Sequence, residues 1–255
     1  MDLTVTCIIP AWNEAARLPG VLGVVLGHPL VDEVLVVDDG STDETAQVAL
    51  AMGARGVRLA PNRGKSAAVA AGLRAAKGRI ILFLDADLQG LSARHVTDLL
   101  MPLRSGVAAA TISLRSNAPW PWRLIGIDYI SGERAMFASM LAPHLDAVAG
   151  LRGFGLEVFL NRLWLQGRHG IAVVPLAGVV SPSKLAKQGW ARGIANDLKM
   201  LRDIFRTVGF ATVLCQIAGL WAARVHRQTA RALLPAVERP RRAAGTSDLD
   251  PDRAP

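Results

Sequence analysis

The chain has 255 residues, of which 51% are hydrophobic, and this is enough for one sizeable core. Its formal net charge is +8, but residues 1–181 carry 16 Lys/Arg against 15 Asp/Glu, so the excess lies at the C-terminal end. A charge confined in this way does not indicate a nucleic-acid partner, and two cysteines, Cys7 and Cys215, exclude a disulfide framework or a cysteine metal site.

Residues 4–113 alternate apolar, β-branched runs with alanine-rich stretches of helical periodicity. The predicted strands are residues 5–10, 33–39, 56–60, 79–87 and 107–114, and the predicted helices are residues 19–27, 43–52, 65–77 and 92–103. This alternation predicts a mostly parallel sheet, and strands that are apolar throughout indicate helices on both faces. The fold class is therefore α/β, and ligands should bind at the carboxyl ends of the strands.

The pattern is less regular after residue 114. We predict a loop or short helix over residues 118–130, a helix over 132–141, a strand over 146–150, an amphipathic helix over 155–166 and a strand over 171–180 that bends at Pro175. The sequence is accordingly divided into a main domain (residues 1–190), basic and apolar C-terminal helices (191–233) and a disordered tail (234–255), which is polar and rich in proline.

Polar turns follow the first two predicted strands, as PAWNE at residues 10–14 and VVDDGSTDE at residues 36–44. A carboxylate at such a strand end can accept a hydrogen bond from a base or a ribose hydroxyl, and Gly40 allows the chain to turn sharply. For Asp43 the better interpretation is a carboxylate in the first turn of the following helix, where Ser41 or Thr42 would act as the cap.

The third predicted strand leads into PNRGKSAAVAAGL, residues 61–73. Gly64, Lys65 and Ser66 resemble the end of a phosphate-binding loop, but the opening glycine of that motif would fall at Leu59. What is left is a Gly-Lys pair at a helix N-terminus, which can hold an anion or a nucleoside. The alternative is that Lys65 is only a solvated charge.

The strongest signal is RIILFLDADLQG, residues 79–90, in which an apolar strand runs directly into Asp85 and Asp87. Two carboxylates at the end of a buried strand need a partner. Side chains two residues apart in an extended segment point the same way, so both can face one cation, or one can face the ribose. Carboxylate oxygens suit a divalent cation such as Mg²⁺ or Mn²⁺ with room for diphosphate oxygens. The sequence therefore predicts a site for a nucleotide-diphosphate sugar.

The motifs PAWNEA, DDGSTDET, NRGKSAAVAAGL and LDADLQG, in this order, resemble family 2 of the inverting glycosyltransferases, which have the GT-A fold. More narrowly, residues 4–190 resemble the polyprenyl-phosphate sugar synthases, such as the dolichol-phosphate mannose synthases. The resemblance implies a metal-assisted hexosyltransferase. It implies nucleoside contacts for Pro10, Trp12, Glu14, Asp39 and Lys65, metal and diphosphate contacts for Asp85 and Asp87, a place near the sugar or metal for Gln89, an acceptor contact for Arg134, an active-site acid at Glu157 and a diphosphate contact for Lys184.

Inversion requires an acceptor oxygen to attack the sugar carbon opposite the leaving diphosphate, whose charge the metal and Lys184 would meet. A hydroxyl acceptor needs a base, for which Glu157 is the candidate, whereas a phosphate acceptor needs none. In the second case Arg115, Arg134 and Arg152 would hold the phosphate. The alternatives are a helix-first-turn carboxylate for Glu157 and a surface arginine for Arg134. A binding module without turnover is the remaining, less favoured reading.

Residues 207–223 carry no charge and lie between two basic segments, 182–206 with six Lys/Arg against two Asp/Glu and 224–255 with seven against four. This pattern allows a helix packed on the globule, a helix lying on an anionic membrane surface, or a membrane span. With the Trp120 and Trp122 segment, it favours a membrane-linked acceptor, a polyprenyl phosphate or an envelope glycan, over a soluble one. We expect a cytoplasmic protein without a cleavable signal, peripheral on the inner face of the cell membrane.

Overall fold

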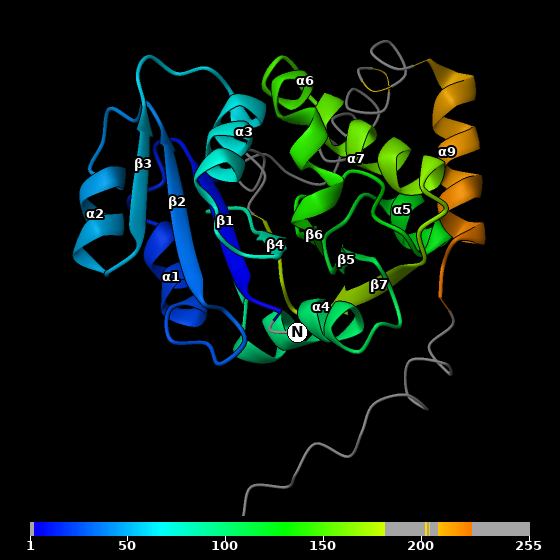
Figure 1. Cartoon of the computed structure of the whole chain (residues 1–255), viewed down its shortest axis with the longest axis horizontal. Helices are drawn as coiled ribbons and strands as arrows, with labels where there is room; N and C mark the ends of the chain where they lie inside the picture. Colours follow the sequence, from blue (N-terminus) through cyan, green and yellow to red (C-terminus); the bar gives the residue numbers. More distant parts are fainter. Residues whose placement is uncertain (1–2, 182–201, 203, 205–208, 226–255) are drawn as a thin grey trace, which may run out of the picture.

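The computed structural model describes residues 3–181, 202, 204 and 209–225, and a seven-stranded sheet runs through its centre (Figure 1). The strands are β1 (Val5–Ala11), β2 (Glu33–Asp39), β3 (Arg55–Leu59), β4 (Ile80–Phe83), β5 (Ala110–Arg115), β6 (Arg134–Phe137) and β7 (Ile171–Leu176). Their order is β3-β2-β1-β4-β6-β5-β7, and β6 runs antiparallel to both of its neighbours while the other described pairings are parallel. The predicted α/β class is confirmed.

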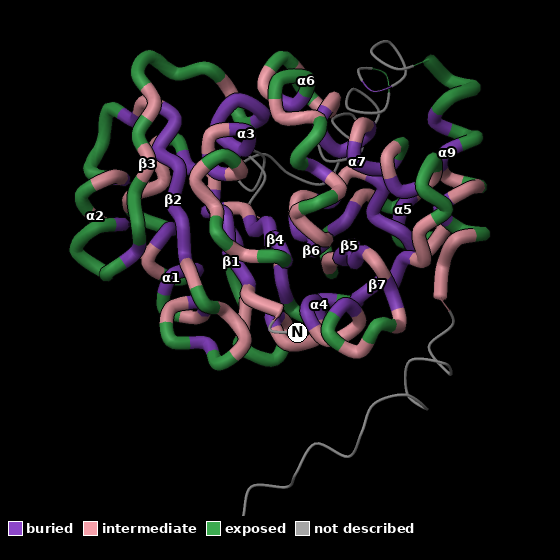
Figure 2. The backbone as a smooth tube through the Cα atoms, in the orientation of Figure 1, coloured by how far each residue is buried: buried purple, intermediate pink, exposed green. Residues whose placement is uncertain are grey.

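Helices cover both faces of the sheet and form two separate cores. One face carries α1 (Leu18–Val25), α2 (Thr45–Ala51) and α4 (Ala93–Arg104); the other carries α3 (Lys65–Ala75), α5 (Trp120–Ile125), α6 (Leu145–Ala149), α7 (Gly155–Gln166) and α9 (Phe210–Ala222). Two short 3₁₀ turns, Ala138–Met140 and Ala142–His144, precede α6. In Figure 2 the strands are largely buried apart from the edge strand β3, whose residues are exposed or half-buried, and this burial explains why the other strands are mostly apolar.

Two predicted elements are wrong. Residues 132–141 contain the strand β6 where we expected a helix, and residues 146–150 fall mostly in α6 where we expected a strand. β6 fills the gap between β4 and β5, whose backbone groups would otherwise lack partners inside the sheet. Pairing between distant strands therefore outweighs the helical periodicity of this segment.

The C-terminal helix α9 packs on the globule through Val213, Gln216 and Leu220, which are buried, and Tyr129 donates a hydrogen bond from its hydroxyl to Gln216 Oε1 at 2.8 Å. Among the described helices, α9 included, none is long and apolar enough to cross a membrane. Lys184, most of the basic segment 182–206, and the tail 234–255 lie outside the described residues. The proposed division of the chain at residues 190 and 233 therefore stays a prediction.

Candidate active site

A cavity of about 450 Å³ opens at the carboxyl ends of β1, β2 and β4. Seven residues singled out from the sequence line it: Pro10, Trp12, Glu14, Asp39, Lys65, Asp85 and Asp87. The parallel strands bring them together because their carboxyl ends meet at one edge of the sheet. Asn62 and Ser181 also line the cavity. We did not single out either residue, although Ser181 lies three residues before Lys184, for which the resemblance implies a diphosphate contact.

The turns after β1 and β2 are joined by backbone and side-chain hydrogen bonds. The amide of Asn13 donates to Ser41 Oγ at 2.9 Å, the amide of Thr42 donates to Asn13 Oδ1 at 2.9 Å, and the amide of Glu14 donates to Thr45 Oγ1 at 2.8 Å. Asp43 accepts from the amide of Thr45 at 3.0 Å but precedes α2, so it lies outside the first turn where we expected it. The predicted cap is also wrong, because Glu44 occupies that position and Ser41 and Thr42 bond to Asn13 instead. The two turns therefore form one wall of the cavity.

Asp39 shapes the adjoining part of the cavity by holding the loop before α3. Its two carboxylate oxygens accept from the amides of Arg63 at 2.8 Å and Gly64 at 2.7 Å. Gly40 has a φ of 72°, and a Cβ there would lie 2.7 Å from the amide nitrogen of Asn62. The predicted sharp turn at Gly40 is confirmed, and its close approach to the loop leaves room only for glycine.

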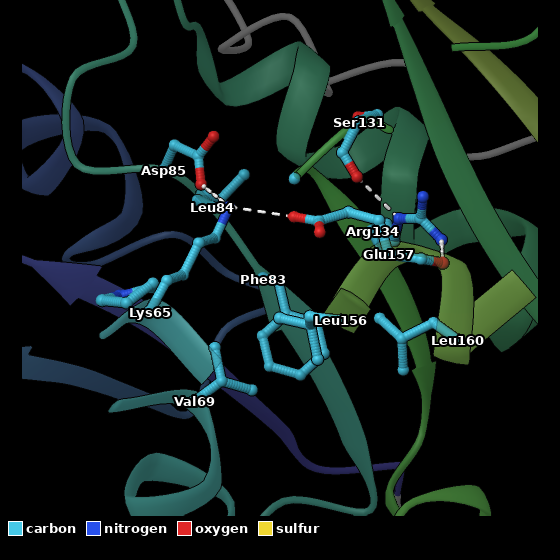
Figure 3. Close-up of a pocket in the computed structure, with 12 residues that line it drawn as sticks. Lys65, Val69, Phe83, Leu84, Asp85, Ser131, Arg134, Leu156, Glu157 and Leu160 are labelled. Carbon is cyan, nitrogen blue, oxygen red and sulfur yellow. Dashed lines mark hydrogen bonds and ion pairs between the residues drawn. The ribbon is translucent and has the colours of Figure 1, made fainter. Parts of the chain in front are cut away.

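Lys65 lies between two carboxylates, as Figure 3 shows. Its Nζ is 2.8 Å from Asp85 Oδ1 and 3.4 Å from Glu157 Oε1. Burial alone would raise the pKa of Asp85, but the charge of Lys65 and the hydrogen bond from it outweigh burial and lower that pKa. Burial works in the opposite direction on Lys65, where the charges of Asp85 and Glu157 prevail and raise the pKa. Lys65 is therefore a paired cation of the site and not merely a solvated charge, although 40% of its side chain remains exposed.

Asp87 lines the same cavity as Asp85 and is held by Ser181. Its two carboxylate oxygens accept from Ser181 Oγ at 2.9 and 2.8 Å. Its pKa is raised, chiefly by burial and also by the charge of Asp85. Asp85 and Asp87 follow β4 in a turn and not in the extended segment we expected, yet both line the same cavity. Their oxygens are a donor set that suits a hard divalent cation.

The described residues contain no group of three or more His, Cys, Asp or Glu side chains placed to hold a metal. A cation at Asp85 and Asp87 would therefore need further ligands from a bound diphosphate or from water, as is usual for Mg²⁺. Gln89, the other residue predicted near the metal, is exposed, and its backbone pairs with Val180 through hydrogen bonds of 2.8 and 3.0 Å. It lies beside the cavity without lining it.

Arg134 is buried, with 1% of its surface exposed, so an ordinary surface arginine is wrong. It lines a small cavity together with Lys65, Asp85 and Glu157, and its acceptor contact stays a prediction. Its guanidinium donates to the carbonyls of Ser131 at 2.6 Å and Tyr129 at 3.0 Å and to Asn161 Oδ1 at 2.7 Å. It also lies 5.0 Å from the ring centre of Trp164. Burial lowers its pKa to about 10. Arg134 therefore holds the segment before β6 against α7.

The segment before β6 lies against the carboxylate of Asp85. A Cβ added to Gly132 would lie 2.6 Å from each carboxylate oxygen of Asp85. Gly132 thus leaves the space that Asp85 occupies. From the first turn of α7, Glu157 lines the small cavity that Asp85, Gly132 and Arg134 also line, and its Oε2 is buried without a hydrogen-bond partner. Both readings of Glu157 fit its position, since it begins a helix and also faces Lys65.

The remaining predicted acceptor residues are placed differently. Arg115 is nearly buried, with its guanidinium 3.3 Å from Asp128 and 3.5 Å from Glu133, so its charge is already met by two carboxylates. Burial raises the pKa of Asp128 to about 6, and the charge of Arg115 opposes that rise. Arg152 is exposed in the loop before α7. Arg115 and Arg134 are thus engaged by other groups of the protein and Arg152 is exposed, so a phosphate site shared by the three arginines stays a prediction.

Comparison with known proteins identifies sugar-transferring enzymes as relatives of this chain. The glucosyl-3-phosphoglycerate synthase of Mycobacterium tuberculosis is 28% identical over 237 residues, which cover 88% of this chain and 67% of that protein. A solved structure of that synthase, holding Mn²⁺, UDP-glucose and phosphoglyceric acid, matches with a TM-score of 0.63 at 25% identity over 84% of this chain and 80% of that one. Another structure of that synthase holds Mg²⁺ and UDP and has a TM-score of 0.62. The sheet is that of the GT-A fold.

A shorter match involves a dolichyl-phosphate beta-glucosyltransferase of Drosophila melanogaster, which is 45% identical over 102 residues, 34% of this chain and 31% of that protein. The family model described as glycosyl transferase family 2 matches residues 6–157. This match spans more than half of the chain and includes the four strand-end motifs and Glu157. The chain therefore belongs to glycosyl transferase family 2.

Proposed function

We propose that this chain transfers a sugar from a uridine diphosphate sugar, with inversion at the sugar carbon and with the help of Mg²⁺ or Mn²⁺. The observation that carries the proposal is that Asp85 and Asp87 line one cavity at the end of β4, with Lys65 against Asp85. The uridine base and the choice of cations come from the mycobacterial synthase, whose structures hold them.

Some residues of the chain bind the nucleoside of the donor, and others meet the negative charge of its diphosphate. The joined turns after β1 and β2 form a wall for the nucleoside, and Trp12, which is 50% exposed, offers a flat apolar surface to it. Asp85 and Asp87 would hold the cation, which when bound withdraws negative charge from the leaving diphosphate. Lys65 supplies a fixed positive charge beside that position, so less reorganisation is needed as the leaving charge develops.

For the acceptor, one candidate is a molecule that attacks through a hydroxyl, such as the phosphoglycerate of the mycobacterial relative. Glu157 favours it, because its Oε2 is buried in the site without a hydrogen-bond partner and can accept a proton. The second candidate is a polyprenyl phosphate, as in the Drosophila relative, and the exposed apolar side of α9 favours it. In that case the attacking phosphate needs no base.

Donor binding is tested by thermal unfolding with UDP-glucose and Mn²⁺. At a ligand concentration of 100 times Kd, the free energy of unfolding should rise by about 2.7 kcal/mol, which corresponds to about 5–10 °C in Tm. The variant Asp85→Ala/Asp87→Ala should lose the part of the shift that needs the cation. The control Asp98→Ala/Asp146→Ala removes two carboxylates from α4 and α6 and should keep it. An undiminished shift and undiminished transfer in the first variant would refute the proposal.

The acceptor candidates are separated by Glu157→Gln. If the acceptor attacks through a hydroxyl, turnover should fall by about 10²–10⁴-fold while donor binding is kept, because the base is lost. If the acceptor is a phosphate, turnover should change little. Rates are compared with phosphoglycerate and with a short-chain polyprenyl phosphate under the same donor conditions. Proton NMR of the product then tests inversion: a beta linkage made from an alpha-linked donor supports it, and an alpha linkage contradicts it.

A further inference from the structure

We infer that the exposed side of α9, together with α5, docks the protein on an anionic lipid surface. This surface, the α5–α9 face, consists of Trp120, Leu124, Phe210, Leu214 and Trp221. The inference is independent of the chemistry at Asp85 and Asp87, and it bears on the proposed function only through the acceptor.

The exposed apolar residues of α9 form one stripe. Phe210 is 59% exposed, Leu214 48% and Trp221 64%. They are four and seven residues apart, close to whole turns of a helix, so they lie above one another. Val213, Gln216 and Leu220 face the globule instead. Because Phe210–Ala222 contains no charged residue, the outer side of the helix offers nothing that water solvates strongly.

Two more exposed apolar side chains lie on α5, at the same end of the molecule (Figure 1). On α5, Trp120 is 53% exposed and Leu124, one turn later, 80%. The two helices belong to the same core through Trp122 and Leu220, and Figures 1 and 2 show them at the same end of the molecule. Five of the eight large hydrophobic side chains exposed in the described part of the chain therefore gather on two helices. A gathering of this kind marks an interaction surface, unlike single exposed residues.

The charged residues near the α5–α9 face indicate which kind of partner binds there. The exposed arginine Arg123 lies on α5 and Arg224 follows α9, while neither helix carries an Asp or Glu. From residue 158 to residue 181 the chain has Arg162 and Arg168 and no acidic residue, and the sequence flanking α9 on either side is also basic. A second copy of this chain would bring like charge to the same face. An anionic lipid surface has the opposite charge and accepts partly inserted tryptophans.

Vesicle co-sedimentation of the full chain tests the inference. Binding should be clear with phosphatidylcholine vesicles containing about a third phosphatidylglycerol, weak with phosphatidylcholine alone, and reduced by 0.5 M salt, since screening weakens the attraction. The variant Phe210→Ser/Trp221→Ser should lower the apparent affinity about tenfold or more. The matched control Leu50→Ser/Met52→Ser removes two exposed apolar side chains at α2, at the opposite end in Figure 1, and should bind as the native chain does.

Three results would overturn the inference. One is equal binding to neutral and anionic vesicles, or no binding to either. Another is that Phe210→Ser/Trp221→Ser and Leu50→Ser/Met52→Ser bind anionic vesicles equally well. The third is a dimer in lipid-free size-exclusion chromatography that Phe210→Ser/Trp221→Ser converts to a monomer, because the face would then join two copies. The donor-induced thermal shift is measured on the same samples. It should be intact in both variants, so a failure of lipid docking stays distinct from a failure of the proposed transfer.

Discussion

At the scale of single residues, the position of Asp85 is set from two sides. Lys65 Nζ holds one carboxylate oxygen at 2.8 Å, and the backbone of Gly132 leaves the space for both. Neither constraint follows from the Asp-x-Asp pattern, because Lys65 comes from α3 and Gly132 from the segment before β6. The pattern identifies the carboxylates, whereas the surrounding backbone decides where they point.

We expect Gly132→Ala to impair catalysis more than stability. The added Cβ would lie 2.6 Å from both Asp85 oxygens, so the carboxylate must move. A displacement of about 1 Å at a reacting site can lower the rate about 10²-fold, and kcat/KM for sugar transfer should fall by about 10–100-fold. Gly150→Ala is the control, because the nearest atom to its Cβ would be 3.8 Å away. Equal kcat/KM in both variants would show that Asp85 tolerates the change.

At the scale of elements, α3 approaches the sheet unusually closely. A Cβ on Gly72 would lie 2.7 Å from Ile8 Cγ2 and 3.0 Å from Val37 Cγ2, on β1 and β2. This approach brings Lys65, at the start of α3, over the carboxyl ends of those strands. The helix periodicity of residues 65–77 predicts α3 itself but not the distance at which it packs.

The variant Gly72→Ala should therefore lower the free energy of unfolding. Overpacking costs about 1–3 kcal/mol, and the better helix propensity of alanine returns about 1 kcal/mol. Gly20→Ala in α1 meets no atom within 4 Å and should be neutral or stabilising. Urea unfolding of the two variants measures the difference. If Gly72→Ala were as stable as Gly20→Ala, the close packing of α3 would be refuted.

Two elements show the limit of local patterns. Residues 132–141 have helical periodicity, yet residues 134–137 form β6 because β4 and β5 both require a partner strand there. Residues 146–150 are predicted as a strand, yet they fall mostly in α6, which packs beside α3 on a sheet face with no strand position left. By contrast, β2 and α7 begin and end at the predicted residues, because their periodicity agrees with their place in the fold.

At the scale of the whole molecule, the C-terminal helix is tied to the segment that borders the site. Tyr129, two residues before Ser131, is fully buried and donates to Gln216 on α9. The carbonyl of Tyr129 also accepts from Arg134 and from Asn161 Nδ2, both at 3.0 Å. The face that we propose to meet lipid and the segment that borders Asp85 are thus joined through one tyrosine.

We expect Tyr129→Phe to destabilise the protein by about 1–3 kcal/mol, because it leaves the buried amide of Gln216 without its partner. Replacing both groups, in Tyr129→Phe/Gln216→Leu, should cost clearly less, since no buried polar group is then left unpaired. Chemical denaturation of the three proteins gives the comparison. A double variant that is less stable than Tyr129→Phe would contradict a role for this hydrogen bond and point to packing alone.

The sequence by itself determined the alternation of strands and helices, the polar motifs at the strand ends and the charge-free helix. Each of these features depends on residues close together in the chain, and strands and helices also show periods of 2 and 3.6. Only the tertiary structure decided that Lys65 pairs with Asp85, that Arg134 is buried, that Arg115 is held by Asp128 and Glu133, and that β6 is a strand. Each of these depends on residues far apart in the chain, whose proximity follows from strand order and helix packing and leaves no local pattern.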